Sequence, residues 1–163
     1  MKRLLLAAVL ACAFCASADA KTAVLLRGIF GEIVAPLTEY EAPLKKKGYT
    51  VVYGSYMAPP NVKADVVIAH SAGADVGPVS YPKALNFPLD GTWAGRGCPK
   101  GTRCINYYAP INKYPFFLCC GGYPTRGSAL TYKEKGTLSF FIWAPGHVSL
   151  PGRVRDRVMQ QVP

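Results

Sequence analysis

Short apolar runs recur along the chain, and each is bounded by glycine, proline or charged residues. The first, Ala-Val-Leu-Leu at residues 23–26, stops at Gly28. Such runs are typical of strands buried on both faces, as in a parallel sheet. Further runs of this kind occupy residues 49–53, 65–69, 84–89, 104–108 and 138–143. The pattern predicts a sheet of about six strands.

Helical periodicity fills some of the intervening segments. Residues 32–47 place Ile33, Leu37, Tyr40 and Leu44 on one helical face. In this helix we expect Pro43 to introduce a kink or an early stop, and Gly48 to end it. Two other helical segments are predicted, one or two turns at residues 70–73 and a final helix at residues 153–162.

The order of these elements predicts the fold class. The strand, helix and strand within residues 23–53 form a βαβ unit, which makes a right-handed crossover in a parallel sheet. The connection at residues 57–63 has no room for a helix, and we expect it to be too short for an ordinary parallel crossover. The prediction is a compact α/β fold, with a mainly parallel sheet flanked by few short helices and a site at the carboxyl ends of its strands.

The amino-terminal segment has the features of a secretory leader. Met1-Lys2-Arg3 is followed by an apolar run at residues 4–16 and by Ala-Asp-Ala at residues 18–20. We expect a signal peptide at residues 1–20 and one domain at residues 21–163, periplasmic or secreted. Lipoprotein processing, with an anchor on Cys12, is the alternative.

The charge balance is basic, with 19 Lys and Arg against 9 Asp and Glu and a formal net charge of +10. Such a balance favours contact with an anionic membrane or envelope surface, and it also serves solubility alone. The cations are scattered and no basic stripe is interleaved with aromatic residues. We therefore expect no nucleic-acid partner.

The cysteines that follow the leader predict disulfide bonds. They are Cys98, Cys104, Cys119 and Cys120. An even number in an exported protein favours disulfides, and two bonds allow three pairings. The simplest pairing joins Cys98 to Cys104 and leaves Cys119 and Cys120 to form a strained bond between adjacent residues. The two crossed pairings also use all four cysteines and stay open. A zinc site is the alternative, but no His lies near these thiols, so we expect no metal and no cofactor.

Ala69-His70-Ser71-Ala72-Gly73 directly follows a predicted strand. A strained turn from strand to helix exposes the nucleophile of many serine hydrolases, and small residues two positions away on either side make room for it. Gly73 occupies the second glycine position of the G-x-S-x-G pattern and Ala69 the first. Ser71 is the candidate nucleophile, with a helix N-cap as its alternative role.

On these residues the chain resembles the α/β-hydrolase superfamily, in particular its small lipases and esterases, some of which also carry Ala at the first position. Residues 25–29 look like the family's first loop, with Arg27 where a His usually stands. The resemblance implies the backbone N–H groups of Ile29 and Ala72 as donors to the oxyanion of the tetrahedral intermediate.

Two histidines follow the leader and compete for the role of base. His70 adjoins Ser71, where its side chain should point away from the nucleophile and pack beneath the turn. His147 lies four residues after the last predicted strand. Family enzymes place the base between the last strand and the last helix, so we expect His147 to activate Ser71. A histidine on a surface loop is the alternative reading of His147.

The resemblance implies an acid between the serine and the base in the chain order. Asp90 ends a predicted strand in a segment similar to the Leu-Asp-Pro turn of some lipases, with Gly91 in place of the Pro. Asp65 begins its strand and so belongs to the opposite edge, and Asp75 falls just after the serine turn. We expect Asp90 to be the acid.

Asn112 is the alternative to Asp90, because it follows the next strand, where many family members keep the acid. An amide can orient an imidazole but cannot stabilise its positive charge.

The predicted function is that of an exported esterase, lipase-like enzyme or thioesterase, acting on a small or surface-accessible ester through an acyl-serine. A non-catalytic envelope protein of the same fold, binding lipid or an anionic polymer, is the runner-up. Arg27, the short connections and the two candidates for the acid favour that second interpretation.

Overall fold

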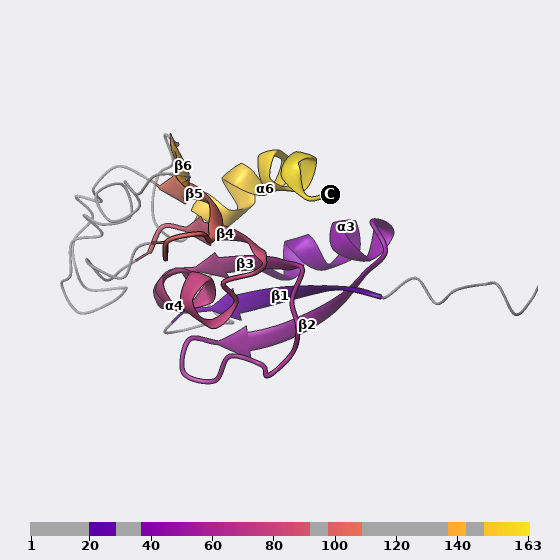
Figure 1. Cartoon of the computed structure of the whole chain (residues 1–163). Coiled ribbons are helices and arrows are strands. Elements are labelled where there is room, and N and C mark those ends of the chain that lie inside the picture. Colours follow the sequence, from indigo (N-terminus) through magenta and orange to yellow (C-terminus); the bar gives the residue numbers. More distant parts are fainter. Residues whose placement is uncertain (1–19, 29–36, 92–97, 109–136, 143–148) are drawn as a thin grey trace, which may run out of the picture.

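The computed structural model describes residues 20–28, 37–91, 98–108, 137–142 and 149–163 of the chain (Figure 1). Its strands are β1 (Lys21–Arg27), β2 (Tyr49–Ser55), β3 (Val66–His70), β4 (Leu85–Leu89), β5 (Arg103–Tyr108) and β6 (Thr137–Phe141). Its helices are the 3-10 turn η1 (Leu37–Tyr40), α3 (Glu41–Lys46), α4 (Ala72–Ser80) and α6 (Leu150–Gln161).

The strands form one sheet of six in the order β2-β1-β3-β4-β5-β6, and every neighbouring pair is parallel. The predicted α/β fold with a parallel sheet of about six strands is confirmed. All carboxyl ends of the strands therefore lie at one edge of the sheet, which we call the carboxyl edge, and all amino ends lie at the other, the amino edge.

Helices cover both faces of the sheet. Figure 1 shows α3 and α6 on one face and α4 on the other. The larger apolar cluster lies beneath α3 and α6 and includes Leu25, Ile68 and Phe87. A smaller cluster beneath α4 includes Val24 and Val67. Neighbouring residues of one strand thus serve opposite faces, which explains why these strands read as continuous apolar runs.

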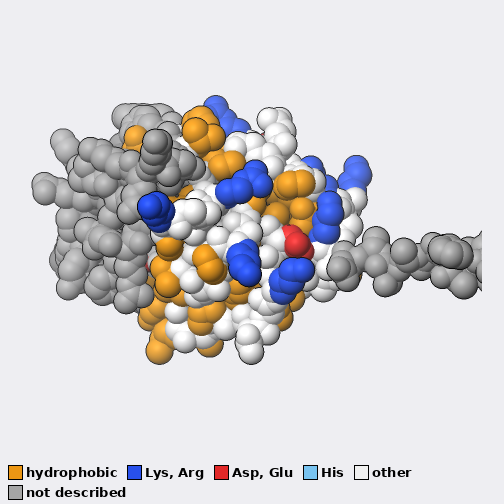
Figure 2. Space-filling view, in the orientation of Figure 1, with side chains coloured by type: hydrophobic (Ala, Val, Ile, Leu, Met, Phe, Trp, Pro, Cys, Tyr) orange, Lys and Arg blue, Asp and Glu red, His pale blue; other side chains and the backbone are white. Residues whose placement is uncertain are grey.

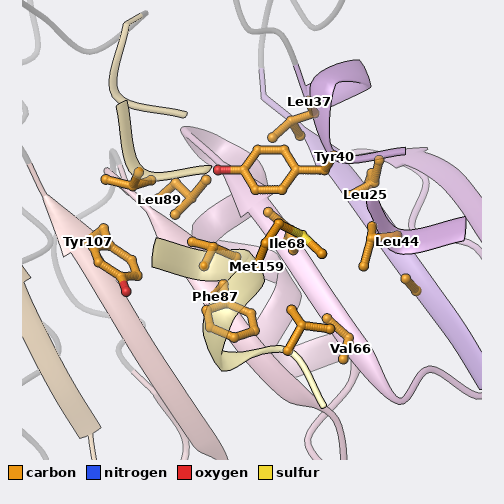
Figure 3. Packing of buried hydrophobic residues seen from close by; sticks show 14 of the residues in the cluster. Leu25, Leu37, Tyr40, Leu44, Val66, Ile68, Phe87, Leu89, Tyr107 and Met159 are labelled. Atoms are coloured by element: carbon orange, nitrogen blue, oxygen red, sulfur yellow. The ribbon is translucent and has the colours of Figure 1, made fainter. Parts of the chain in front are cut away.

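Tyr40 joins η1 to α6 across the larger cluster (Figure 3). Its ring is fully buried, and its hydroxyl donates a hydrogen bond to the carbonyl oxygen of Pro151 at 2.7 Å. Burial is the main reason why the pKa of Tyr40 lies well above its usual range. The hydroxyl therefore remains a hydrogen-bond donor, and it fixes the start of α6 over the sheet.

The first predicted helix is shorter than its periodicity indicated. The described part of residues 32–47 is the turn η1 followed by the six-residue helix α3. Pro43 lies in the first turn of α3, where a backbone N–H has no partner within the helix, so the helix continues past it to Lys46 and does not stop there. Leu37, Tyr40 and Leu44 are buried as predicted, and Gly48 ends the helix with a φ of +83°.

Two other helices are longer than predicted. The segment expected to make one or two turns after Ser71 is the nine-residue helix α4. Small residues such as Gly73 and Gly77 lower its intrinsic helix propensity, so its packing against β1, β3 and β4 supplies the stability. Helix α6 begins at Leu150, three residues before the predicted start.

The expectation for the connection between β2 and β3 was wrong. Both strands are parallel to β1, which lies between them, so a ten-residue segment without a helix completes a crossover. Extended chain spans about 3.3 Å per residue, so ten residues can return the length of β2. Pro60 packs on Gly54, where a Cβ would lie 2.3 Å from the proline Cδ, and Tyr81 donates a hydrogen bond to the Pro60 carbonyl oxygen at 2.5 Å.

A disulfide joins Cys98 to Cys104, as the simplest predicted closure requires. It ties the loop before β5 to that strand, and both residues are buried. Cys119, Cys120 and Cys12 lie outside the described residues. In the part of the chain described above, no helix is long and apolar enough to cross a bilayer.

We predict that the double variant Cys98→Ser/Cys104→Ser loses about 2 kcal/mol of unfolding free energy, because the bond closes a short loop in the unfolded chain. Urea unfolding of both proteins under oxidising conditions measures this loss. Mass spectrometry of a non-reduced digest should find residues 98 and 104 linked to each other. A link from Cys98 to Cys119 or Cys120 would contradict the pairing.

Candidate active site

Ser71 stands between β3 and α4 at the carboxyl edge of the sheet. Its φ of +59° and ψ of −130° are unusual for a residue with a side chain, and such conformations cost about 1–3 kcal/mol. The Ser71 N–H donates to the Leu89 carbonyl oxygen at 3.0 Å, and the Ser71 carbonyl accepts from the Ala74 N–H at 2.9 Å. Neighbouring backbone on both sides thus holds the strained turn.

Two glycines let the end of β1 approach this turn closely. A Cβ on Gly28 would lie 2.5 Å from the Cβ of Ser71 and 2.8 Å from its Oγ. A Cβ on Gly73 would lie 2.6 Å from the Leu26 carbonyl oxygen. Both distances are too short for any other residue without a shift of the structure, so Gly28, the first residue after β1, lies against the Ser71 side chain.

One of the two predicted oxyanion donors, Ala72, lies in a segment that meets the end of β1 here. Ala72 is the first residue of α4 and is buried, and its N–H lies at the positive end of the helix dipole. Ile29 follows Gly28 in the chain and lies outside the described residues. Of the two predicted donors, the structure thus describes only that of Ala72.

Asp90 follows β4, the strand next to β3. The register pairs His70 with Leu89, so Ser71 and Asp90 are each one residue beyond a paired position. Adjacent strands lie about 4.8 Å apart. Asp90 is fully buried, has a φ of +49°, and donates its N–H to the Tyr107 carbonyl oxygen at 2.8 Å. Two residues with left-handed backbone therefore lie side by side at the carboxyl edge.

Asp75 is a second buried acid at this edge, for which its place just after the serine turn predicted no role. It lies in the first turn of α4 and is 3 % exposed. A Cβ on Gly91 would lie 2.6 Å from Asp75 Oδ1, so the carboxylate packs directly against the turn that follows Asp90. No local pattern in the sequence predicts this contact, because residues 75 and 91 are brought together only by the fold.

The other candidate bases and acids lie away from the Ser71 turn or outside the described residues. His70 is 2 % exposed, and strand alternation turns its side chain to the same face as Ile68, beneath α6. Asp65 precedes β3 at the amino edge, where its carboxylate accepts the Thr22 N–H at 2.7 Å. His147 and Asn112 lie outside the described residues.

Arg27 ends β1 beside this site, and its guanidinium lies 4.5 Å from the centre of the Tyr53 ring. Burial, and then the hydrogen bond to Glu41, raises the pKa of Tyr53 to about 12. The hydrogen bond from Lys45, and then that from Tyr53, lowers the pKa of Glu41. The contact with the tyrosine ring therefore places the Arg27 guanidinium over β2.

Within residues 20–28, 37–91, 98–108, 137–142 and 149–163, no group of three or more His, Cys, Asp or Glu side chains could hold a metal ion.

No protein-family model and no curated protein matches the chain. Among solved structures, the esterase domain of a Rhodothermus marinus protein is similar, with a TM-score of 0.60 and 9 % sequence identity. The likeness covers 90 % of this chain and 88 % of that chain. It shows that the two chains share their fold, and it spans nearly the full length of both.

We predict that Gly73→Ala lowers the free energy of unfolding by about 1–3 kcal/mol, because the new Cβ must displace the backbone of β1. Thermal and urea unfolding measure the loss. Gly152→Ala in α6 is the matched control, because its Cβ would have no neighbour nearer than 3.5 Å. The control should be neutral or gain up to about 1 kcal/mol from its higher helix propensity. Equal stabilities of the two variants would contradict the close approach.

Proposed function

We propose that the protein is an exported serine hydrolase that cleaves a carboxylic ester or thioester through an acyl-serine intermediate. In this proposal Ser71 is the nucleophile, His147 the general base and Asp90 the acid that orients it. The observation that carries the proposal is the strained, glycine-lined turn that holds Ser71 between a strand and the start of a helix at the carboxyl edge.

The reaction begins when Ser71 Oγ attacks the carbonyl carbon of the ester and His147 accepts the hydroxyl proton. The tetrahedral intermediate collapses as the C–O or C–S bond to the leaving group breaks, and the imidazolium returns the proton to that group. Water then attacks the carbonyl carbon of the acyl-serine while His147 accepts a proton from that water. Collapse of this second intermediate breaks the bond to Ser71 Oγ, which regains its proton from His147, and releases the carboxylic acid.

The Ile29 and Ala72 N–H groups stabilise the negative oxygen of each tetrahedral intermediate. Each such donor typically contributes on the order of 3 kcal/mol to lowering the barrier. The support for this role is that Ala72 begins α4 and that Gly28, next to Ile29, lies against the Ser71 side chain. Both donors are backbone groups, so Arg27 in place of the family's histidine leaves them unchanged.

The role of Asp90 rests on its position and burial. Its strand neighbours that of Ser71, and a fully buried carboxylate is stable only with hydrogen-bond donors or a cation close to it. An imidazolium formed at His147 would supply such a positive charge during the reaction. Asp75 packs against Gly91 and so supports the turn that presents Asp90.

Export and the substrate class follow from features outside the serine turn. The predicted leader and the Cys98–Cys104 disulfide support an oxidising compartment. The described residues use six strands and a few short helices, and a chain of 163 residues leaves little further material for a deep acyl pocket. The proposal therefore favours small or surface-accessible esters.

We predict that a fluorophosphonate probe labels the protein and that Ser71→Ala abolishes labelling. His147→Ala should slow labelling by at least about a thousandfold, since the serine hydroxyl is a weak nucleophile without its base. Gel fluorescence and hydrolysis of short p-nitrophenyl esters measure the two effects.

Ser80→Ala is the matched control for the serine variant, because Ser80 is exposed at the other end of α4. This variant should label like the unmodified protein. Absence of labelling in the folded, oxidised protein would reject the hydrolase and favour the non-catalytic envelope protein.

A separate prediction concerns the acid. Asp90→Asn should lower the rate of labelling on the order of 10⁴-fold, because an amide cannot stabilise the imidazolium. Asp65→Asn, at the opposite edge of the sheet, should change the rate less than about twofold. A full rate in Asp90→Asn combined with a large loss in Asn112→Ala would transfer the role to Asn112.

A further inference from the structure

An exposed cation stands at the amino end of each strand from β1 to β5. Lys21 begins β1 and Arg103 begins β5, while Lys47, Lys63 and Lys83 each precede a strand by two or three residues. Lys46 and Lys100 add two more exposed charges at the same edge. We call these seven residues the amino-edge cations: Lys21, Lys46, Lys47, Lys63, Lys83, Lys100 and Arg103.

The parallel sheet brings these residues together although they are distant in the sequence. The register pairs Lys21 with Tyr49, Ala23 with Val66, and Leu85 with both Val66 and Arg103. Five neighbouring strands at about 4.8 Å spacing make a row roughly 19 Å wide. In Figure 2 the blue side chains lie across the described surface and gather toward the side where β1 and β2 begin, with little red among them.

Few acids balance this row. At the amino edge the described acidic side chain is that of Asp65, whose carboxylate already accepts the Thr22 N–H. At the same edge Lys47 donates a hydrogen bond to the Val162 carbonyl oxygen at 2.6 Å, and the Tyr49 hydroxyl donates to a Pro163 oxygen at 3.1 Å. Asp75 and Asp90 are buried at the opposite edge. Glu39, Glu41 and Asp156 form salt bridges with Arg155 or Lys45. Within the described ranges, Lys63 and Lys83 have no salt bridge, so the row keeps most of its positive charge.

Exposed apolar side chains flank the two unpaired lysines. Val62 precedes Lys63 and is 39 % exposed, and Val79 near the end of α4 is 50 % exposed. The hydrogen bond from Tyr81 to Pro60 holds the segments that carry these two valines next to each other. Cations interspersed with exposed aliphatic groups suit a lipid head-group layer better than a soluble polymer, because the aliphatic groups can leave water there.

We propose that the amino-edge cations, with Val62 and Val79, form a docking surface for an anionic lipid bilayer. Cleavage of the predicted leader after Ala20 would add the α-amino group of Lys21 to the same surface. The seven residues of β1 separate this surface from the Ser71 edge by about 23 Å. Docking therefore turns the candidate active site toward the aqueous side, and it does not depend on whether Ser71 is reactive.

Sedimentation with vesicles tests the proposal directly. The purified protein should bind phosphatidylcholine vesicles that contain about 30 mol % phosphatidylglycerol, and should not bind pure phosphatidylcholine. Raising the salt concentration from about 0.05 M to about 0.5 M should release it. No ester is present in the assay, so its result is independent of the proposed hydrolase activity.

Two double variants of equal net charge locate the surface. Lys63→Gln/Lys83→Gln should weaken binding to the anionic vesicles roughly 25-fold, at about fivefold per charge near the membrane. Arg153→Gln/Arg157→Gln, on the exposed side of α6, should weaken it less than about threefold. All four side chains are exposed, and circular dichroism checks that each variant folds.

Three results would overturn the proposal. One is no binding to anionic vesicles at low salt, and the second is an equal loss in both double variants, which would assign the binding to net charge alone. The third is retention on a soluble acidic polymer such as polyglutamate without vesicle binding, which would assign this edge to an acidic polymer.

Discussion

The close approach of three backbone segments around Ser71 is the constraint on which the candidate site depends. Leu26 and Gly28 come from the end of β1, Leu89 from the end of β4, and Ser71 leaves β3 between them. The left-handed backbone at Ser71 is unfavourable in isolation, and it persists because hydrogen bonds and steric contact on both sides determine it. The sheet order is therefore part of the site, since it makes β1 and β4 the two neighbours of β3.

Charge is distributed unevenly along the strands. The buried acids Asp75 and Asp90 lie at the carboxyl edge on either side of Gly91, whereas exposed lysines collect at the amino edge. A buried carboxylate is stable only beside hydrogen-bond donors or a cation, so the groups that pack around Asp75 and Asp90 must supply one or the other. The lysines are exposed to water, where an anionic partner can reach them.

The sequence predicted the parallel sheet well because its strands are buried on both faces and appear as uninterrupted apolar runs. It predicted the turn at Ser71 because small residues surround the serine. Helix lengths were harder, since α4 has weak intrinsic propensity and depends on its tertiary contacts. The contact of Asp75 with Gly91 was not predictable, because it joins residues that only the fold brings together. The roles of His147, Ile29 and Asn112 stay predictions, as they lie outside the described residues.

The helix-free connection between β2 and β3 has a consequence for how a short chain can sustain a wide sheet. Pro59 and Pro60 restrict this segment before folding begins, so ordering it loses less conformational entropy than ordering an unrestricted loop. Their rings replace the side chains that a crossover helix would have supplied, as the contact of Pro60 with Gly54 illustrates. The two prolines thus make the connection rigid without a helix, and the small α/β domain keeps β2 as the outer strand of its parallel sheet.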